Sequence, residues 1–304
     1  MSIEILPLVE SCYPDAVEIF NRENADYPLV APLTLDLFVK HIASKTMFDS
    51  QTSFVAAENG KAVGFALGCV GSDKLKSHPE PGKSGIDGLF FPRDRLRVGD
   101  ALIEACVEAL KARGAHRVYG FASWTGYPFW RGIYTGSEPV CLTEYVQMWT
   151  RFMAHGFTHH QQSFTYLGPI EPYACRADFD YELADQDISS PWAQESWRGL
   201  RPRCLRPKVN GESYGRLGIV DLPLISERRG IATAGIWGMW VEPQHRRKGV
   251  ATAMVGRGLE LMKEEGTKEL IVGTTVENFA ARGVYEKAGL RNVAYRTGTY
   301  LDLA

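Results

Sequence analysis

The chain is 304 residues long, more than one hydrophobic core usually holds, so its length predicts two domains. Hydrophobic side chains make up 45% of the residues and charged ones 23%, the ordinary composition of a globular protein. Because 34 basic side chains balance 36 acidic ones, for a net charge of −2, the whole chain gives no reason to expect nucleic acid or an anionic membrane as a partner.

The cysteines and the opening segment bear on metal binding and on location. Residues 1–15 lack the basic region and apolar core of a signal peptide, and no apolar run approaches the length that spans a membrane. The cysteines are scattered without a CxxC pair, which predicts neither a zinc site nor a dithiol redox motif: Cys12, Cys69, Cys106, Cys141, Cys175 and Cys204. We therefore expect a cytoplasmic protein with no metal ion and with reduced, buried cysteines.

Turn and helix-end signals recur along the chain at a nearly constant offset. Asn59-Gly60, between two apolar runs, is typical of a tight hairpin, and Asn210-Gly211 repeats it 151 residues later. Residues 109–123 indicate a helix that ends at a glycine and is followed by a strand, and residues 261–275 repeat this pattern 152 residues later. These repeats indicate a tandem duplication.

A third landmark, Gly-apolar after a helix, shows where the two copies differ in length. It occurs at Gly156-Phe157 and at Gly289-Leu290, and the first copy holds 19 more residues between this glycine and the preceding helix-end glycine. The surplus falls in residues 124–140, which are rich in glycine, proline and aromatic residues and therefore predict a long loop. This loop either packs within its own half or offers an aromatic surface to the other half.

The order of elements in each copy predicts the fold class. Each reads as strand, helices, hairpin, strand, helix, strand, helix and strands, which predicts an α/β (α+β) fold with a mixed central sheet flanked by helices. Two prolines interrupt the pattern near residues 168–176. We expect one domain over residues 1–170 and a second over residues 171–304.

The start of one helix in the second copy has the features of an anion site. Residues 232–241 read as a buried strand, and a loop with Gly249 leads into a helix that begins with Val250 and small Ala251. Unpaired N–H groups at such a helix start suit a pyrophosphate, and Arg246, Arg247 and Lys248 add positive charge. A basic, solvated turn without a ligand is the simpler alternative.

This segment resembles the GNAT N-acetyltransferase superfamily. Residues 246–251, RRKGVA, fit its Arg/Gln-x-x-Gly-x-Gly/Ala pattern, and residues 278–290 fit a second conserved segment; the resemblance covers residues 205–302 well and the first half more loosely. It implies acetyl-CoA as the co-substrate, with the pantetheine arm along Met239 and Val241. The pyrophosphate would lie at the loop and helix start, and one asparagine would contact the coenzyme: Arg246, Arg247, Lys248, Gly249, Val250, Ala251, Thr252 and Asn278.

The same resemblance implies that Tyr285 is the general acid, because a positioned phenol can protonate a departing thiolate. Packing without a catalytic role is the alternative for this residue. The sequence does not identify a general base: residues 232–241 contain no carboxylate, and Glu242 and Glu277 are nearby but typical of surface positions. A chain of water molecules and a route assisted by the backbone remain alternatives.

The corresponding positions of the first copy lack these residues. Arg97 stands opposite Gly249 and Asp94 opposite Arg246, while Phe152 and Tyr145 stand opposite Tyr285 and Asn278. We expect a degenerate first copy with a structural or acceptor-shaping role, although Gly99, opposite Ala251, leaves cofactor binding there open.

The sequence therefore predicts an acyl-CoA-dependent N-acyltransferase with one competent site, in the second half. We expect the acceptor to be a primary amine of a small molecule, bound where the two halves meet. A protein or peptide N-acetyltransferase and a non-catalytic acyl-CoA sensor are the alternatives, and the oligomeric state stays open.

Overall fold

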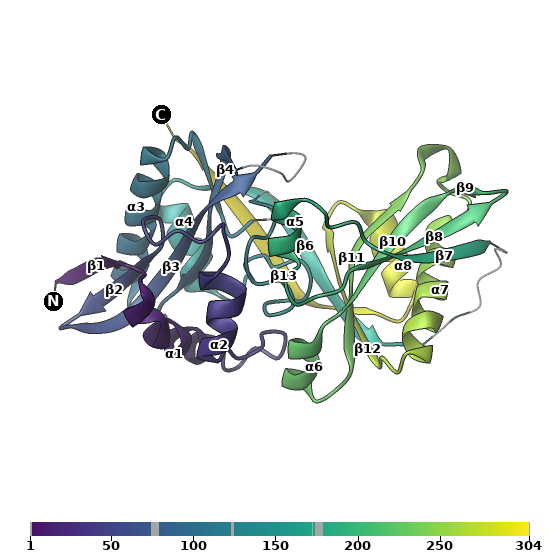
Figure 1. The fold of residues 1–304 in the computed structure, drawn as a ribbon, viewed down its shortest axis with the longest axis horizontal. Coiled ribbons are helices and arrows are strands. Elements are labelled where there is room, and N and C mark those ends of the chain that lie inside the picture. The colour runs from purple at the N-terminus through teal and green to yellow at the C-terminus, as the bar shows by residue number, and fades with distance from the viewer. Residues whose placement is uncertain (1, 74–78, 123–124, 172, 174–178, 304) are drawn as a thin grey trace.

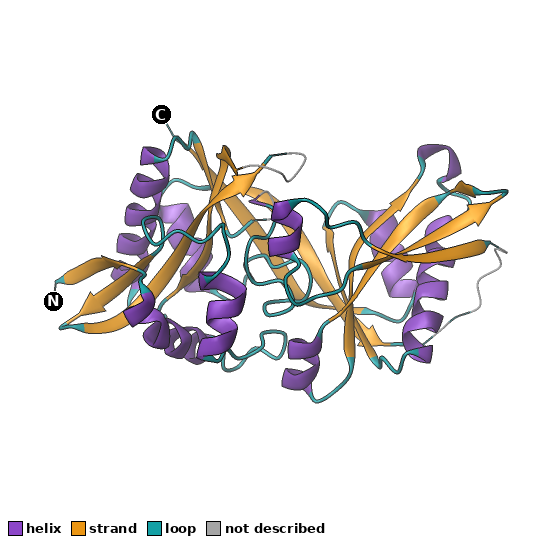
Figure 2. Ribbon diagram, in the orientation of Figure 1, coloured by secondary structure: helices purple, strands orange, loops and turns teal. Residues whose placement is uncertain are grey.

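A single sheet runs through the whole of the computed structural model, which describes residues 2–73, 79–122, 125–171, 173 and 179–303. Thirteen strands of this described part form the sheet, in the order β1-β2-β3-β4-β5-β13-β6-β12-β11-β10-β8-β7, with β9 paired to β8. Helices cover both halves, which lie side by side along the long axis of the molecule (Figures 1 and 2). The α/β fold class predicted from the sequence is thus confirmed.

The first half contains the following elements: β1 (Ile3–Pro7), a 3-10 turn (Glu10–Cys12), α1 (Tyr13–Glu23), α2 (Leu35–Phe38) continued by a π-turn (Val39–Ala43), β2 (Phe54–Glu58), β3 (Lys61–Ser72), β4 (Pro79–Phe90), α3 (Leu96–Ala112), β5 (Arg117–Gly120), α4 (Val146–Ala154) and β6 (Thr158–Pro169). The second half follows a similar order, with a single opening helix and an additional helix, α6, before β11: β7 (Asp180–Asp185), α5 (Pro191–Ser196), β8 (Arg203–Val209), β9 (Glu212–Ser213), β10 (Gly215–Asp221), α6 (Pro223–Arg229), β11 (Thr233–Val241), a 3-10 turn (Pro243–His245), α7 (Val250–Glu264), β12 (Glu269–Thr275), α8 (Phe279–Lys287) and β13 (Arg291–Asp302).

The repeated sequence signals fall at equivalent places in the two halves. Asn59-Gly60 and Asn210-Gly211 form the tips of the β2–β3 and β8–β9 hairpins, with positive φ at all four residues. The helix-end glycines 114 and 266 both have φ +87°, a conformation that costs glycine little. The first residue before α4 is Tyr145, and the first before α8 is Asn278, so the alignment of these two helices holds in three dimensions.

The two halves exchange their last strands. β13 pairs with β5 through residues 299–302, and with β6 along most of its length. β6 in turn pairs with β12 of the second half, from Ser163↔Thr275 to Pro169↔Glu269. Accordingly, the C-terminal end of β13 lies beside the first half in Figure 1, on the same side as the N-terminus. Each half of the sheet is completed by a strand from the other half of the sequence.

This exchange bears on the expected division into residues 1–170 and 171–304. A cut there would divide the sequence repeat, but it would also separate β6 from both of its neighbouring strands. The division stays a prediction about the order of the sequence, whereas the sheet itself is continuous across it.

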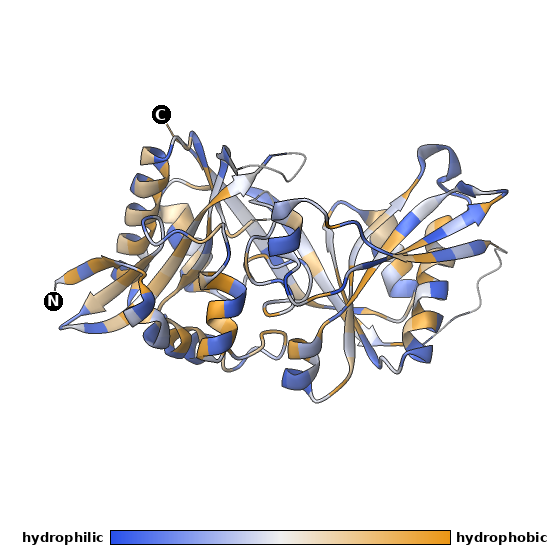
Figure 3. Cartoon of the chain, in the orientation of Figure 1, coloured by the Kyte–Doolittle hydropathy of each residue, from blue (hydrophilic) through white to orange (hydrophobic). Residues whose placement is uncertain are grey.

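Two hydrophobic clusters lie on the faces of the sheet. One fills the first half, where α3 packs on β3 and β4, and it extends to Trp192, Trp197 and Ile271 of the second half. The other lies under α7 and includes Tyr166 of β6. Hydrophobic residues follow the inner strands in Figure 3, whereas the outer β8–β9 hairpin tip is hydrophilic. Both clusters therefore draw on residues from both halves.

The 124–140 loop packs largely within its own half. Phe129, Trp130 and Tyr134 are buried in the first cluster, and Trp130 stacks on Phe20 with ring centres 4.9 Å apart. Trp124, at the start of this loop, lies outside the described residues, as does Cys175. The five described cysteines are free, and all but Cys12 are buried. No helix in the described ranges is long and apolar enough to cross a membrane.

Candidate active site

A gap between two neighbouring strands creates a large cavity in the second half. The parallel strands β11 and β12 pair from Thr233↔Glu269 to Ile236↔Val272 and no further. At this point β11 carries a bulge, because Trp237 has no partner in the β10 ladder. Beyond the bulge the strands diverge and enclose a cavity of about 600 Å³. Its walls include residues 238–241 of β11, residues 273 and 274 of β12, and parts of α7 and α8.

The start of α7 forms one end of this cavity. Gly249 caps the helix with φ +81°, a left-handed conformation, and the first helical hydrogen bond runs from Ala253 N–H to Gly249 O at 2.9 Å. The N–H groups of the first turn have no acceptor within the helix. A Cβ added at Gly249 would meet no atom within 4 Å, so the space in front of this backbone is open. Gly249, Val250, Ala251 and Thr252 all line the cavity.

The three basic residues before this helix are placed differently. Arg246 donates from Nε to Val241 O at 3.0 Å, and its guanidinium lies 4.7 Å from the centre of the Trp240 ring. Arg246 and Arg247 both line the cavity, whereas Lys248 is exposed and does not. The preceding turn is held by His245, whose ring stacks on Tyr214 at 3.5 Å.

Helix α8 brings Asn278 and Tyr285 to the same cavity. Asn278 caps the helix, since its Oδ1 accepts a hydrogen bond from Ala281 N–H at 3.2 Å. Tyr285, two turns further, is only 3% exposed, and its hydroxyl has no hydrogen-bond partner within the described residues. Burial raises the pKa of the Tyr285 phenol above its ordinary value, and the negative charge of Glu138 raises it further. The phenol is therefore protonated at neutral pH.

Glu138 is a site residue that the sequence did not reveal. It belongs to the first-half loop, yet it lines the cavity together with Tyr285, whereas the other described lining residues come from the second half. Burial raises the pKa of the Glu138 carboxyl, and the positive charges of Arg296 and Arg131 oppose that rise. No spacing in the sequence relates residue 138 to residue 285; the extra loop was the only available signal.

A second cavity adjoins the first at Glu138. It has a volume of about 440 Å³ and is lined by both halves: Tyr127, Arg131 and Glu138 from the first, and residues 186–190, Ala193, Trp197 and Trp237 from the second. The two sequence candidates for a base do not line the 600 Å³ cavity. Glu242 lies in a separate pocket beside Arg206 and Arg216, and Glu277 is exposed.

Residues 174–290 match the family model described as "Acetyltransferase (GNAT) family". Residues 174–290 are thus a GNAT acetyltransferase domain by sequence. A relative from Bacillus subtilis (strain 168), whose name describes it as a ribosomal protein bS18-alanine N-acetyltransferase, is 24% identical over 127 residues, which are 41% of this chain and 81% of the relative.

Solved structures extend the likeness in fold to both halves. A tandem GNAT protein from the clavulanic acid biosynthesis pathway has a TM-score of 0.69 at 12% identity, covering 99% of this chain and 98% of its own. A glucosamine N-acetyltransferase region of a fungal multi-domain β-N-acetylglucosaminidase has a TM-score of 0.68 at 14% identity, covering 99% of this chain and 38% of its own. At these identities the likeness establishes the fold alone.

The first half differs from the GNAT domain at the equivalent gap. β4 and β5 pair in parallel from Ser84↔Val118 to Ile86↔Gly120, but loop side chains occupy the space that follows. Trp130 Nε1 donates to Asp87 O, and Thr125 Oγ1 donates to the Asp87 carboxylate at 3.1 Å. Only about 10 Å³ remains in the pocket around Asp87 and Trp130.

The first-half residues opposite the predicted site are packed rather than open. A Cβ added at Gly99 would lie 2.4 Å from the Phe91 ring, so this glycine makes room for an aromatic side chain. Phe152 is buried with its ring centre 4.9 Å from that of Phe157, and the Tyr145 hydroxyl donates to Asn24. Arg97 is exposed. The predicted cofactor contacts therefore have no open counterpart among these described residues.

Proposed function

We propose that this protein is an acetyl-CoA-dependent N-acetyltransferase that acts on a primary amine of a small molecule. One observation carries the proposal: a single cavity in the β11–β12 gap extends from the first turn of α7 to the buried phenol of Tyr285. The α7 end suits an anion, and the Tyr285 end suits an acid that protonates a leaving group.

The cavity wall fits coenzyme A along its length. The N–H groups at Gly249 to Thr252, with Arg247 beside them, would hold the pyrophosphate. The edge of β11 at Met239 and Val241, which no longer pairs with β12, would offer backbone groups to the pantetheine arm. The Arg246 guanidinium packs on Trp240, so Arg246 would stabilise this wall of the cavity and would not itself bind the coenzyme. The Asn278 side-chain oxygen caps α8, and its amide nitrogen would contact the coenzyme. Lys248 would contribute through its charge alone.

Tyr285 would donate the proton that the reaction needs at sulfur. As the amine nitrogen bonds to the thioester carbonyl carbon, the carbon–sulfur bond breaks and leaves a thiolate. Burial keeps the phenol protonated and makes it a weaker acid, but the same burial makes a thiolate beside it more basic, which offsets that loss.

The second cavity is the proposed acceptor site. Its volume of about 440 Å³ suits a small molecule, and its walls combine the aromatic rings of Tyr127, Trp197 and Trp237 with charged groups. Because both halves line it, a bound acceptor would be enclosed between them. We infer that the first half shapes this site while its own gap is filled.

A protein N-terminus is the second candidate acceptor, since the Bacillus subtilis relative is named for alanine N-acetylation of a ribosomal protein. Purified protein with acetyl-CoA should be offered two panels: small amines, including amino sugars, arylalkylamines and arylamines, and peptides with a free N-terminal alanine. Mass spectrometry should detect a gain of one acetyl group on a small amine. Acetylation confined to peptides would favour the second candidate, and coenzyme A binding with no product in either panel would indicate a sensor.

A further inference from the structure

The loop segment at residues 136–138 is fixed by contacts that do not involve the Glu138 side chain, two of them to β11 and β13. Ser137 Oγ donates to Ile236 O of β11 at 3.4 Å, and Arg131 donates to Ser137 O. Arg296 of β13 donates from Nη1 to Glu138 O at 2.6 Å. Gly136 has φ +93°, and a Cβ added there would lie 3.3 Å from Ile271. The position of Glu138 is therefore set by its backbone and not by its side chain.

The Glu138 carboxylate itself makes no hydrogen bond or ion pair within the described residues, although the residue faces both cavities. Arg131 and Arg296, the nearest cations, use guanidinium nitrogens on the carbonyl oxygens of residues 137 and 138. A half-buried carboxylate without a partner, placed where two cavities meet, is free to contact a group of a bound ligand.

We propose that Glu138, supplied by the first half, is the group that takes a proton from the acceptor amine in the active site of the second half. This inference rests on the proposed function. The ammonium form of the acceptor gives one proton to the Glu138 carboxylate, which later releases it to water. The neutral amine then bonds to the carbonyl carbon and the carbon–sulfur bond breaks. Tyr285 protonates the sulfur and regains a proton from the nitrogen of the adduct, so that amide and thiol leave with the charges balanced.

The surroundings of Glu138 suit this step. Burial raises the pKa of its carboxyl, which strengthens the carboxylate as a base, while the positive charges of Arg296 on β13 and Arg131 on the same loop oppose that rise. The phenol of Tyr285 on α8 also faces it and stays neutral. His245 is the other titratable base that lines the cavity, but it stacks on Tyr214 and its Nε2 lies 3.4 Å from Glu212, at the α7 end.

The test is Glu138→Gln, with Glu277→Gln as the matched control on an exposed carboxylate. At pH 7 the variant should lose about 100-fold or more in kcat/KM for an arylalkylamine such as benzylamine, or for the best alkylamine of the panel. The affinity for coenzyme A and the melting temperature should stay unchanged, because none of the contacts that hold the loop uses the Glu138 side chain. The control should keep full activity.

Two further readouts separate catalysis from structure. The loss should shrink as the pH approaches the pKa of the amine, and an arylamine, which is already neutral at pH 7, should be acetylated at nearly the wild-type rate. A Glu138→Gln enzyme that keeps its rate with alkylamines would overturn the inference while leaving the proposed function intact. If the wild-type protein acetylates no amine in the panels, the proposed function and the role of Glu138 are both contradicted.

Discussion

At the scale of single residues, Tyr285 and Tyr166 offer a matched pair. Their rings lie 5.9 Å apart, but Tyr285 lines the cavity with no partner for its hydroxyl in the described structure, whereas Tyr166 donates to Glu286 at 2.9 Å. Removing the Tyr285 hydroxyl therefore breaks no hydrogen bond of the described fold. Any loss of rate in Tyr285→Phe would report on the reaction.

We expect Tyr285→Phe to lower kcat by about 100-fold or more while coenzyme A affinity changes less than about twofold, the pattern of a lost general acid. Steady-state kinetics and calorimetry measure the two quantities. Tyr166→Phe should leave kcat nearly unchanged. Full activity in Tyr285→Phe would mean that this phenol only packs.

Gly249 can be probed with two substitutions that share the same backbone strain. Both Gly249→Ala and Gly249→Arg place a Cβ at φ +81°, which costs about 1–2 kcal/mol of stability. Only arginine fills the open space in front of the helix start. We expect Gly249→Arg to weaken coenzyme A binding at least tenfold, or about 1.4 kcal/mol, and Gly249→Ala to weaken it much less. Calorimetry that finds equal affinities for both variants would contradict a pyrophosphate site here.

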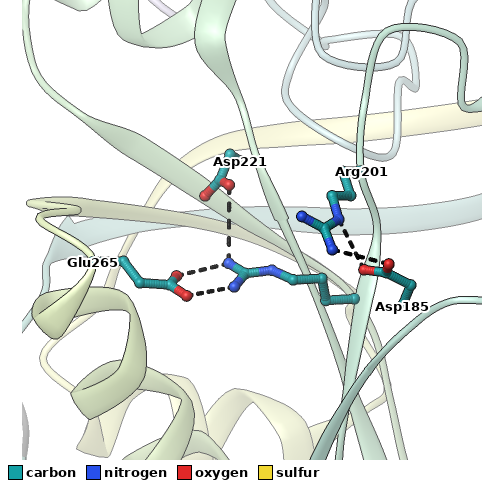
Figure 4. A network of polar contacts seen from close by, with 5 residues as sticks. Asp185, Arg201, Asp221 and Glu265 are labelled. Carbon is teal, nitrogen blue, oxygen red and sulfur yellow. Dashed lines mark hydrogen bonds and ion pairs between the residues drawn. The ribbon is translucent and has the colours of Figure 1, made fainter.

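At the scale of elements, an ion-pair network fixes the C-terminal end of α7 to the sheet (Figure 4). Arg203 of β8 donates to both carboxylate oxygens of Glu265, at 2.5 and 2.7 Å, and lies 3.9 Å from Asp221 of β10. Glu265 follows α7, where the helix dipole disfavours a negative charge, so Arg203 offsets that cost.

This network predicts a pH-dependent contribution to stability. The hydrogen bond from Arg203 holds the pKa of Glu265 below its ordinary value of about 4.3. Because the folded pKa is the lower one, the stabilisation is present above pH ~4.3 and is lost as the pH falls through the folded pKa.

Glu265→Gln should therefore lower the free energy of unfolding by about 1 kcal/mol at pH 7, discounted for partial exposure, and by less at pH 3. Urea unfolding at the two pH values measures the difference. The exposed pair Arg201–Asp185 serves as the control, since Arg201→Met should change stability little. An equal loss for Glu265→Gln at both pH values would argue against the ion pair.

At the scale of the whole molecule, the exchanged strands tie the two halves into one folding unit. β6 lies between β12 and β13, so unfolding the first half would remove a neighbour from both strands. A fragment of residues 171–304 would lack β6, and we expect it not to fold stably.

The same link predicts that a defect in one half destabilises the other. Leu102 is fully buried in α3 of the first half, and Leu102→Ala should lower stability by about 2–5 kcal/mol. Loss of coenzyme A binding in urea reports on unfolding of the second half, and the change in tryptophan fluorescence reports on the whole chain. We expect Leu102→Ala to lower the urea midpoints of both transitions by the same amount. Two separate transitions, with coenzyme A binding unaffected by the substitution, would indicate independent halves.

Much of the fold could be predicted from the sequence because its signals are local. The hairpin turn at Asn210-Gly211, the glycine at the end of α7 and the helix start at Gly249 each depend on the conformation of a few neighbouring residues. Asn278 and Tyr285 share one helix at a spacing of two turns, so their common cavity also followed from local periodicity.

Features that depend on distant segments were decided only by the tertiary structure. β13 inserts between β5 and β6 through hydrogen bonds that any strand can make, so no pattern in the sequence foretold the exchange. Glu138 lines the same cavity as Tyr285 because its loop packs on β11 and β13, more than 90 residues further along the chain. The sequence by itself determined the repeated turns and helix ends and the site at the start of α7, because each depends on interactions between neighbouring residues. Which half of the chain supplies each wall of the cavity was decided only by tertiary packing.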